Sequence, residues 1–257
     1  MATKTTLNSK NLEALGAERL AELLIEVSTG DAAMKRRLRL ELAGAASPAE
    51  AAREVRKRLA SIARGRTFID WQKRRAFVAD IATQRRAIVD QIAPGDPGEA
   101  LDLLWQFLSL AGPVYDRCDD SSGAIGDEFR AACVDLGAIA QVVGPDPERL
   151  AERTFDAICA NDYGQYDDLI ALLAPALGPK GLDHLKARVM DLARTPVATP
   201  PDREREKIGW ATSGPIYADQ IARSRHDSTV QLALEAIADA QGDVDGFIAQ
   251  KTDKAKT

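Results

Sequence analysis

The sequence predicts an all-α protein of stacked antiparallel helical hairpins, an α-solenoid-like arrangement of about ten to twelve helices. Three observations predict this fold class. Alanine, leucine, arginine and glutamate, which favour helix, dominate the 257-residue chain. Valine, isoleucine and threonine are never gathered into the alternating runs typical of strands. Proline and glycine lie between helix-periodic segments, where they mark helix boundaries.

The first half of the chain shows several helix boundaries. A helix after Gly16 places apolar residues on one face and ends at residues 28–30. Its apolar residues are Leu20, Leu23, Leu24 and Val27. Asp31 is placed to cap a second helix, which carries Met34, Leu38 and Leu42. A long helix is expected from Asp70 to the proline and glycine at 94–95.

A capping residue followed by a proline recurs along the chain and predicts three further helix starts. These pairs are Ser47 and Pro48, Asp96 and Pro97, and Asp146 and Pro147. The prolines are 49 and 50 residues apart, and Pro196 follows after another 49. Two helices fit in each interval, as in helical-hairpin repeats of about HEAT length. We therefore favour stacked hairpins over a closed bundle.

The prolines also predict how the chain is divided. Residues 1–194 are expected to form a helical-hairpin domain, and residues 195–202 a proline-rich hinge. Residues 203–257 are expected to form a C-terminal helical segment, with packing on the first domain as one alternative. Within it we expect a helix over 203–225, interrupted at Gly214 and Pro215, and another from Asp227.

Charge is divided sharply along the chain. Residues 35–86 contain 15 Lys or Arg and 5 Asp or Glu, whereas residues 87–170 contain 4 and 17. The first segment could present a basic surface to nucleic acid, an acidic partner or anionic lipid. Alternatively, the two segments are neighbouring solvated faces of opposite charge, and we favour this interpretation.

No pattern for catalysis, cofactor binding or metal binding is recognised, so we predict no such residues and no cofactor. Residues 116–129 fit the calcium-loop template poorly, because Cys118 and Phe129 fall at its first and last ligand positions. We interpret this acidic stretch as favouring the start of a helix near Gly126. His184 and His226 are interpreted as structural, and the tryptophans Trp71, Trp105 and Trp210 as core residues.

Residues 159–170 read CANDYGQYDDLI and are predicted to form a corner between two helices. Gly164 is expected to end the first helix and Asp167 to cap the second. Tyr163 and Tyr166 would fill the end of the hairpin, with their hydroxyl groups near Asn161 or Asp162. A binding site is the alternative. The candidate interaction surface is Tyr163, Tyr166, Asp167, Arg56, Arg58, Arg74 and Arg75.

Five stretches together resemble an uncharacterised bacterial family of all-helical proteins, a domain of unknown function. They are NLEALGAERLAELLIEV, FIDWQKRRAFVADI, EALDLLWQFLSLA, ANDYGQYDDLIALLAPALGPKGL and HDSTVQLALEAIADAQGDVDGFI. The resemblance implies a TPR-like helical repeat and carries no activity. Because members often continue with further helices, the chain is either a short member or a truncated one. Truncation would leave an apolar face near Ile237 and Phe247 uncovered.

We expect a non-enzymatic α-helical scaffold or protein-interaction module whose partner is another protein or peptide. The first alternative is nucleic-acid binding by residues 35–86. The second is an enzyme with carboxylates in a groove between helices. No apolar run approaches the roughly 18 residues that cross a membrane, and the first residues lack the apolar core of a signal peptide. Three cysteines give no paired disulfide framework, so we expect a cytoplasmic protein without membrane partners.

Overall fold

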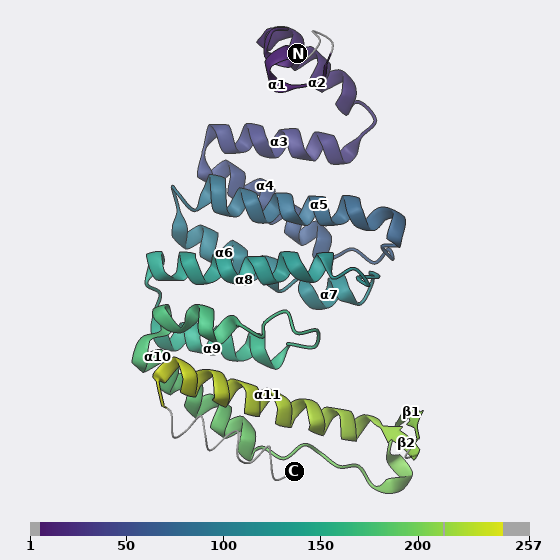
Figure 1. The fold of residues 1–257 in the computed structure, drawn as a ribbon, viewed down its shortest axis with the longest axis vertical. Coiled ribbons are helices and arrows are strands. Elements are labelled where there is room, and N and C mark those ends of the chain that lie inside the picture. Colours follow the sequence, from purple (N-terminus) through teal and green to yellow (C-terminus); the bar gives the residue numbers. More distant parts are fainter. Residues whose placement is uncertain (1–5, 213, 244–257) are drawn as a thin grey trace.

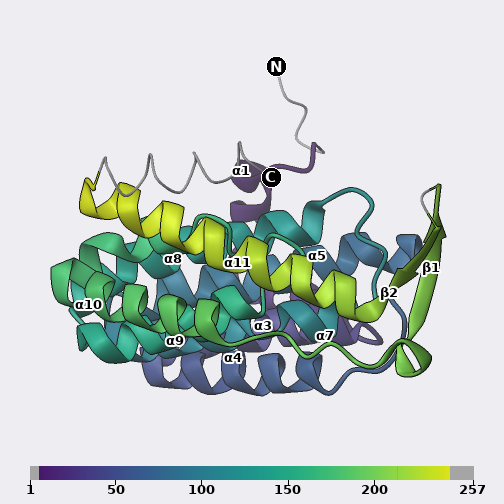
Figure 2. The ribbon, with the colours of Figure 1, turned by 90° about the horizontal axis from the view of Figure 1, so that it is seen from below.

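The computed structural model describes residues 6–212 and 214–243, and it is elongated (Figure 1). The helices follow one another along the longest axis, most of them lying across it, and the N-terminal helices α1 and α2 lie at one end. Seen along that axis, α5, α8 and α11 form one layer, and α4 and α9 lie in a second layer (Figure 2). Their bounds are α4 (Pro48–Ala63), α5 (Trp71–Ala87), α8 (Ala124–Val143), α9 (Pro147–Cys159) and α11 (Ala218–Gln241).

The predicted helical fold class is confirmed. The described residues contain eleven α-helices and one small two-stranded sheet. The remaining α-helices are α1 (Ser9–Glu13), α2 (Ala17–Ser28), α3 (Ala32–Ala46), α6 (Pro97–Leu108), α7 (Ala111–Tyr115) and α10 (Leu169–Arg194). A π-helical turn, η1 (Ile88–Ile92), continues α5 to the predicted end at residues 94–95. The α-solenoid interpretation stays a prediction.

The three predicted cap-proline starts are confirmed. The side chains of Ser47, Asp96 and Asp146 each accept a hydrogen bond from the backbone N–H three residues later, at 3.1, 2.9 and 2.8 Å. Each bond satisfies a donor that the helix itself leaves free. Two main helices follow each start, α4 and α5, α6 and α8, and α9 and α10. Pro196 departs from the pattern, because it follows the end of α10 and begins no helix.

The N-terminal helices have the predicted bounds but not the predicted burial. Asp31 caps α3 as expected, accepting from the backbone N–H groups of Ala33 and Met34. The apolar face of α2 is largely exposed, and Ser28 is the one buried residue in that helix. Leu24 and Val27 therefore face solvent. The reason is position, since α2 lies at one end of the molecule and, among the described residues, contacts mainly α1 and α3 (Figure 1).

The core lies in the middle of the molecule, where α6, α8 and α10 meet. The rings of Phe107 and Phe129 lie 5.4 Å apart, both fully buried. Gly137 of α8 lets α10 approach closely, because a Cβ atom there would lie 2.7 Å from the carbonyl oxygen of Leu172. Of the three tryptophans interpreted as core, Trp105 alone is buried. That interpretation is wrong for Trp71 and Trp210, which are 69% and 70% exposed.

The segment from 195 to 217 differs most from prediction. Residues 195–201 form no helix, and a short 3₁₀ turn, η2 (Asp202–Glu204), follows them. The expected helix over 203–225 is wrong, because its first part forms an antiparallel hairpin of β1 (Lys207–Ala211) and β2 (Gly214–Tyr217). Gly214 has φ +124°, which favours glycine, and Pro215 cannot continue a helix.

Helix α11 packs along α10. It is continuous from Ala218, so the expected helix start at Asp227 is wrong; that residue lies inside α11. Ile237, predicted to be uncovered in a truncated chain, is fully buried, and Phe247 lies outside the described residues. The helix therefore closes the end of the core.

Candidate interaction surface

The corner between α9 and α10, residues 160–168, is a loop built on two side-chain amides. The Asn161 amide donates to the Asp167 carboxylate at 2.7 Å, and its oxygen accepts from the backbone N–H of Tyr166 at 2.9 Å. Gln165 is buried and accepts from the backbone N–H of Tyr163 at 3.2 Å. These bonds fix the backbone of the corner, so its surface is preformed.

Two details of the predicted corner are wrong. Helix α9 ends at Cys159, before Gly164, which has φ +72° in the middle of the loop. Asp168, not Asp167, occupies the cap position of α10, and its side chain makes no cap bond. The physical reason is the pair of amides at 161 and 165, which hold a longer loop than a glycine-terminated turn requires.

The two tyrosines have different environments. Tyr166 is 6% exposed, and its hydroxyl donates at 2.7 Å to the carbonyl of Leu108 rather than to the predicted partners. Burial raises the pKa of the Tyr166 phenol above its usual range. Tyr163 is 52% exposed and stacks on Tyr115, with ring centroids 4.3 Å apart. Burial likewise raises the pKa of Tyr115, to about 12.

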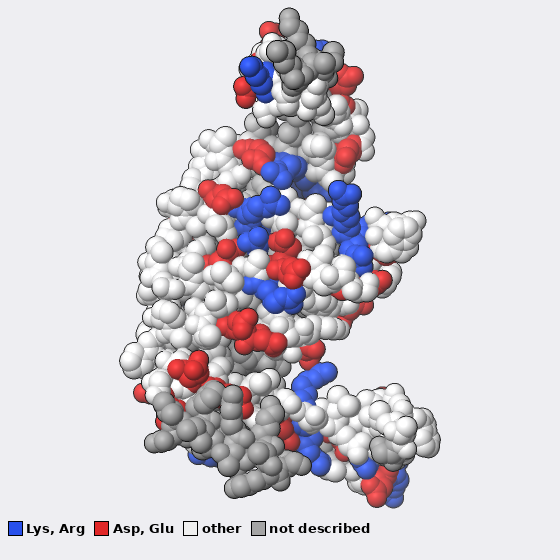
Figure 3. Space-filling model, viewed as in Figure 1, with Lys and Arg blue, Asp and Glu red and all other residues white. Residues whose placement is uncertain are grey.

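Three hollows meet at this corner, and we call them together the corner surface. One of about 590 Å³ lies between the corner and α6, α7 and α9, where the Arg153 guanidinium covers the Trp105 ring at 4.9 Å. A second, of about 550 Å³, lies between the corner, α10 and α11. A third, of about 390 Å³, lies between the corner, α8 and α10. The edge that holds this corner is hollowed between the start of α5 and the β1–β2 hairpin (Figure 3).

The corner surface is acidic. Among the described residues, six carboxylates and three guanidinium groups line its hollows. The guanidinium groups belong to Arg130, Arg153 and Arg225, and all three already pair with carboxylates, at 2.6, 2.8 and 2.7 Å. Asp156, Asp168 and Asp239 make no side-chain hydrogen bond or ion pair within the described part of the chain. The surface therefore carries uncompensated negative charge.

The four predicted arginines do not join the corner. Arg56 and Arg58 lie on α4, where they pair with Glu99 of α6 and Asp80 of α5. Arg74, on α5, donates at 3.0 Å to the carbonyl of Asp119. The adjacent Arg75 is exposed. The candidate surface predicted from sequence thus forms two separate groups in the structure. Residues of α11 lie beside the corner group, although nothing in the sequence pattern connects them to it.

The basic and acidic segments are joined by ion pairs. Arg85 of α5 contacts Glu128 at 3.0 Å and Asp135 at 2.5 Å, both on α8, and all three side chains are largely buried. Lys and Arg gather over α3 and α5, with Asp and Glu among them and toward α8 (Figure 3). This arrangement agrees with the interpretation of the two segments as neighbouring faces of opposite charge.

The remaining polar candidates have structural partners. The Asp120 carboxylate accepts from the backbone N–H groups of Ile125 and Gly126 at 3.0 and 2.9 Å, at the start of α8. The Glu152 carboxylate bonds His184 at 2.6 Å and Arg188 at 3.1 Å, and the His184 bond is the main cause of its lowered pKa. Within the described residues, no three His, Cys, Asp or Glu side chains are placed to hold a metal ion.

Comparison with known sequences places the chain in a family. A model described as "Family of unknown function (DUF6880)" matches residues 2–257. The chain belongs to this family. Its membership of DUF6880 confirms the resemblance seen in the sequence, while the bacterial origin and the TPR-like repeat stay predictions. Neither curated proteins nor solved structures gave a match. In the described part of this DUF6880 chain, no helix has the length and apolar character needed to cross a bilayer.

Proposed function

We propose that this protein is a non-enzymatic α-helical interaction module, of the TPR-like helical-repeat kind, that binds a basic segment of a partner protein. The observation that carries the proposal is the meeting of three hollows at one acidic corner. A cytoplasmic setting is part of the proposal, in keeping with the free thiols of Cys118, Cys133 and Cys159.

The chemistry of the hollows supports a peptide with alternating basic and apolar side chains. Leu232 of α11 and Ile170 of α10 give the second hollow an apolar wall, and Leu232 is exposed there. Carboxylates stand beside this wall, so a lysine or arginine stem can cover apolar surface while its charge reaches Asp239. Electrostatic complementarity of this kind raises the association rate and selects the partner's charge.

The rigidity of the corner supports the same proposal. Because Tyr166 and Gln165 are buried and hydrogen-bonded, binding requires little ordering of this loop. A preformed surface loses less conformational entropy on binding, so more of the contact energy becomes affinity.

Peptide binding measured by fluorescence polarisation tests the proposal. Lysine- and arginine-rich peptides should bind saturably, and acidic peptides of equal length should not. The double variant Asp168→Lys, Asp239→Lys should raise the dissociation constant of the peptide by about tenfold or more, since each lost charge-assisted contact is worth about 1.5–3 kcal/mol. The matched control is Glu26→Lys on α2, an exposed carboxylate at the far end of the molecule.

Absence of basic-peptide binding, or equal weakening by Glu26→Lys, would refute the proposal. A photo-crosslinking amino acid at position 163 gives an independent measurement, because Tyr163 is exposed on the corner. It should capture the bound peptide, whereas the same group at position 142, an exposed site near the other end of α8, should not.

Nucleic-acid binding by residues 35–86 is the second candidate, favoured by the Lys and Arg gathered over α3 and α5 (Figure 3). Arg56, Arg58 and Arg85 are already paired with carboxylates, which weakens this candidate. Filter binding at low salt distinguishes it, since phosphate-backbone contacts must produce salt-sensitive retention of DNA or RNA.

A further inference from the structure

A fourth hollow, distant from the corner surface, lies between α3, α4 and α5 and has a volume of about 330 Å³. We call it the basic pocket. Its lining includes five cations, Lys35, Arg36, Arg39, Lys57 and Arg58. One carboxylate, Glu54, stands against them in the lining. A space of this size is at the lower end of the range for small-molecule sites.

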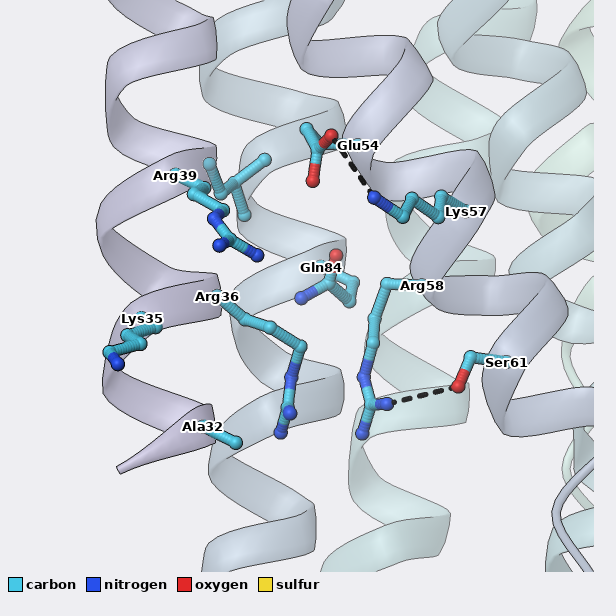
Figure 4. A pocket seen from close by; sticks show the side chains of 10 residues that line it. Ala32, Lys35, Arg36, Arg39, Glu54, Lys57, Arg58, Ser61 and Gln84 are labelled. Carbon is cyan, nitrogen blue, oxygen red and sulfur yellow. Dashed lines mark hydrogen bonds and ion pairs between the residues drawn. The ribbon is translucent and has the colours of Figure 1, made fainter. Parts of the chain in front are cut away.

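The side chains differ in direction (Figure 4). The guanidinium groups of Arg36, Arg39 and Arg58 and the amide of Gln84 project into the pocket. Lys35 projects away from it, and Lys57 reaches toward Glu54, with their charged atoms 3.8 Å apart. The pocket interior is therefore faced by three guanidinium groups and one amide.

Neutralisation inside the pocket is incomplete. Arg58 already has partners, since it donates to the Asp80 carboxylate from Nε, at 2.9 Å, and from Nη2, and to the Ser61 hydroxyl from Nη1 at 3.3 Å. Arg36 and Arg39 form no ion pair within the described part of the chain. The Nε atom of Arg36 is moreover buried without a hydrogen-bond partner among the residues that the structure describes. A buried donor without an acceptor costs free energy, and an anion in the pocket would remove that cost.

We propose that the basic pocket binds a small phosphate-bearing molecule. Guanidinium groups present paired donors that match phosphate oxygens, and several of them together favour a doubly charged group over a single carboxylate. Gln84 is buried, and its amide Nε2 donates to Asp80 at 3.5 Å, which leaves its second N–H as a neutral donor from α5. Leu40 and Ala32 add apolar surface to the lining, which suits an organic group attached to the phosphate. This site is independent of peptide binding at the corner.

Calorimetric titration of the full chain tests the proposal, with inorganic phosphate, pyrophosphate and ADP as the free ligands. Vesicles containing a phosphorylated inositol lipid and a short oligonucleotide test the two other sources of phosphate. At least one free ligand should bind saturably, and the melting temperature should rise as the concentration of that ligand increases. The affinity should fall as salt is added.

Variants locate the site. Arg36→Gln and Arg39→Gln should each weaken binding by about tenfold or more, because each removes a charge-assisted contact. Arg36→Lys keeps the charge but loses the paired donors, so it should also weaken phosphate binding. This variant tests the site if Arg36→Gln folds poorly. Arg53→Gln is the control, since this exposed arginine of α4 pairs with Glu50 outside the pocket.

Three outcomes would overturn the proposal. The first is that no free ligand binds saturably at up to about 10 mM. The second is that binding survives Arg36→Gln and Arg39→Gln. The third is that Arg53→Gln lowers the affinity for the ligand as much as the pocket variants do. Binding to vesicles or oligonucleotide alone would likewise replace the small molecule with a lipid or nucleic-acid phosphate. Peptide binding at the corner should be unchanged in all these variants, so failure here is distinguishable from failure of the proposed function.

Discussion

The hydroxyl of Tyr166 donates a hydrogen bond of 2.7 Å to the carbonyl of Leu108, the last residue of α6. The last carbonyls of a helix have no partner within it, so Tyr166 satisfies an acceptor that would otherwise be buried and unpaired. The bond also joins two segments 58 residues apart. It fixes the corner surface to the centre of the core.

Replacing Tyr166 by phenylalanine should lower the free energy of unfolding by about 1–2 kcal/mol, because the buried carbonyl loses its donor. Tyr166→Ala should cost about 3–5 kcal/mol, since it also leaves a cavity. Urea denaturation measures both. Tyr163→Phe is the control and should change stability by less than about 0.5 kcal/mol. A Tyr166→Phe protein with the same free energy of unfolding as the wild type would contradict the role given to this bond.

Gly137→Ala should lower the free energy of unfolding by about 1–3 kcal/mol, because the added methyl would press α8 against the backbone of α10. Gly112→Ala is a matched control on α7, where a Cβ atom would meet no atom of the described residues within 4 Å. That substitution should be neutral or stabilising by up to about 1 kcal/mol. Equal effects of the two changes in thermal denaturation would show that helix contact at Gly137 is unimportant.

Arg85→Gln should destabilise the protein by about 3 kcal/mol, because it leaves the Glu128 and Asp135 carboxylates largely buried without their cation. Adding Asp135→Asn should recover part of the loss, and a double-mutant cycle in urea measures the coupling. The exposed neighbour Arg86 provides the control substitution Arg86→Gln. Additive losses in the cycle would contradict the ion pair.

His226 should make the packing of α11 on α10 depend on pH. Its ring contacts the Asp227 carboxylate at 3.0 Å and the Leu192 carbonyl at 3.0 Å, near the end of α10. The Asp227 bond, followed by the Leu192 bond, raises the pKa of His226 above its ordinary value of 6.5. The charged imidazole therefore stabilises the folded state at pH below the unfolded pKa, and this contribution is lost as pH rises through the folded pKa.

The comparison of wild type with His226→Gln isolates this contribution. The difference in free energy of unfolding should be about 0.5–1 kcal/mol at pH 5.5 and should fall as pH rises to 8. Urea titrations at several pH values measure it. A difference that is constant, or that grows with pH, would contradict the raised pKa.

Features that depend on neighbouring residues were predictable from the sequence. Ser47, Asp96 and Asp146 cap helices through bonds that span three residues, so their pattern is visible along the chain. The β1–β2 hairpin was not predicted, because its strands are short and its alternation at Ile208 and Trp210 covers few residues. The glycine and proline at 214 and 215 are its signal in the sequence, but the same pair also fits an interrupted helix.

Features that depend on packing of distant segments could not be read from the sequence. The Tyr166 partner lies in α6, and the second hollow of the corner surface requires α11 to lie beside the corner. The basic pocket likewise requires α3, α4 and α5 together. Sequence indicated that Tyr163 and Tyr166 belong to one corner, but only the fold separates the buried ring from the exposed one.

The shallow packing of α2 predicts how the molecule opens. Since Ser28 is its one buried residue, this helix can detach without exposing much of the central core. Backbone amides of α1 and α2 should exchange with deuterium through such local openings, well before those of α6 and α8. The protein would then show a gradient of exchange protection along its length, with the Phe107 and Phe129 region exchanging only when the whole molecule unfolds.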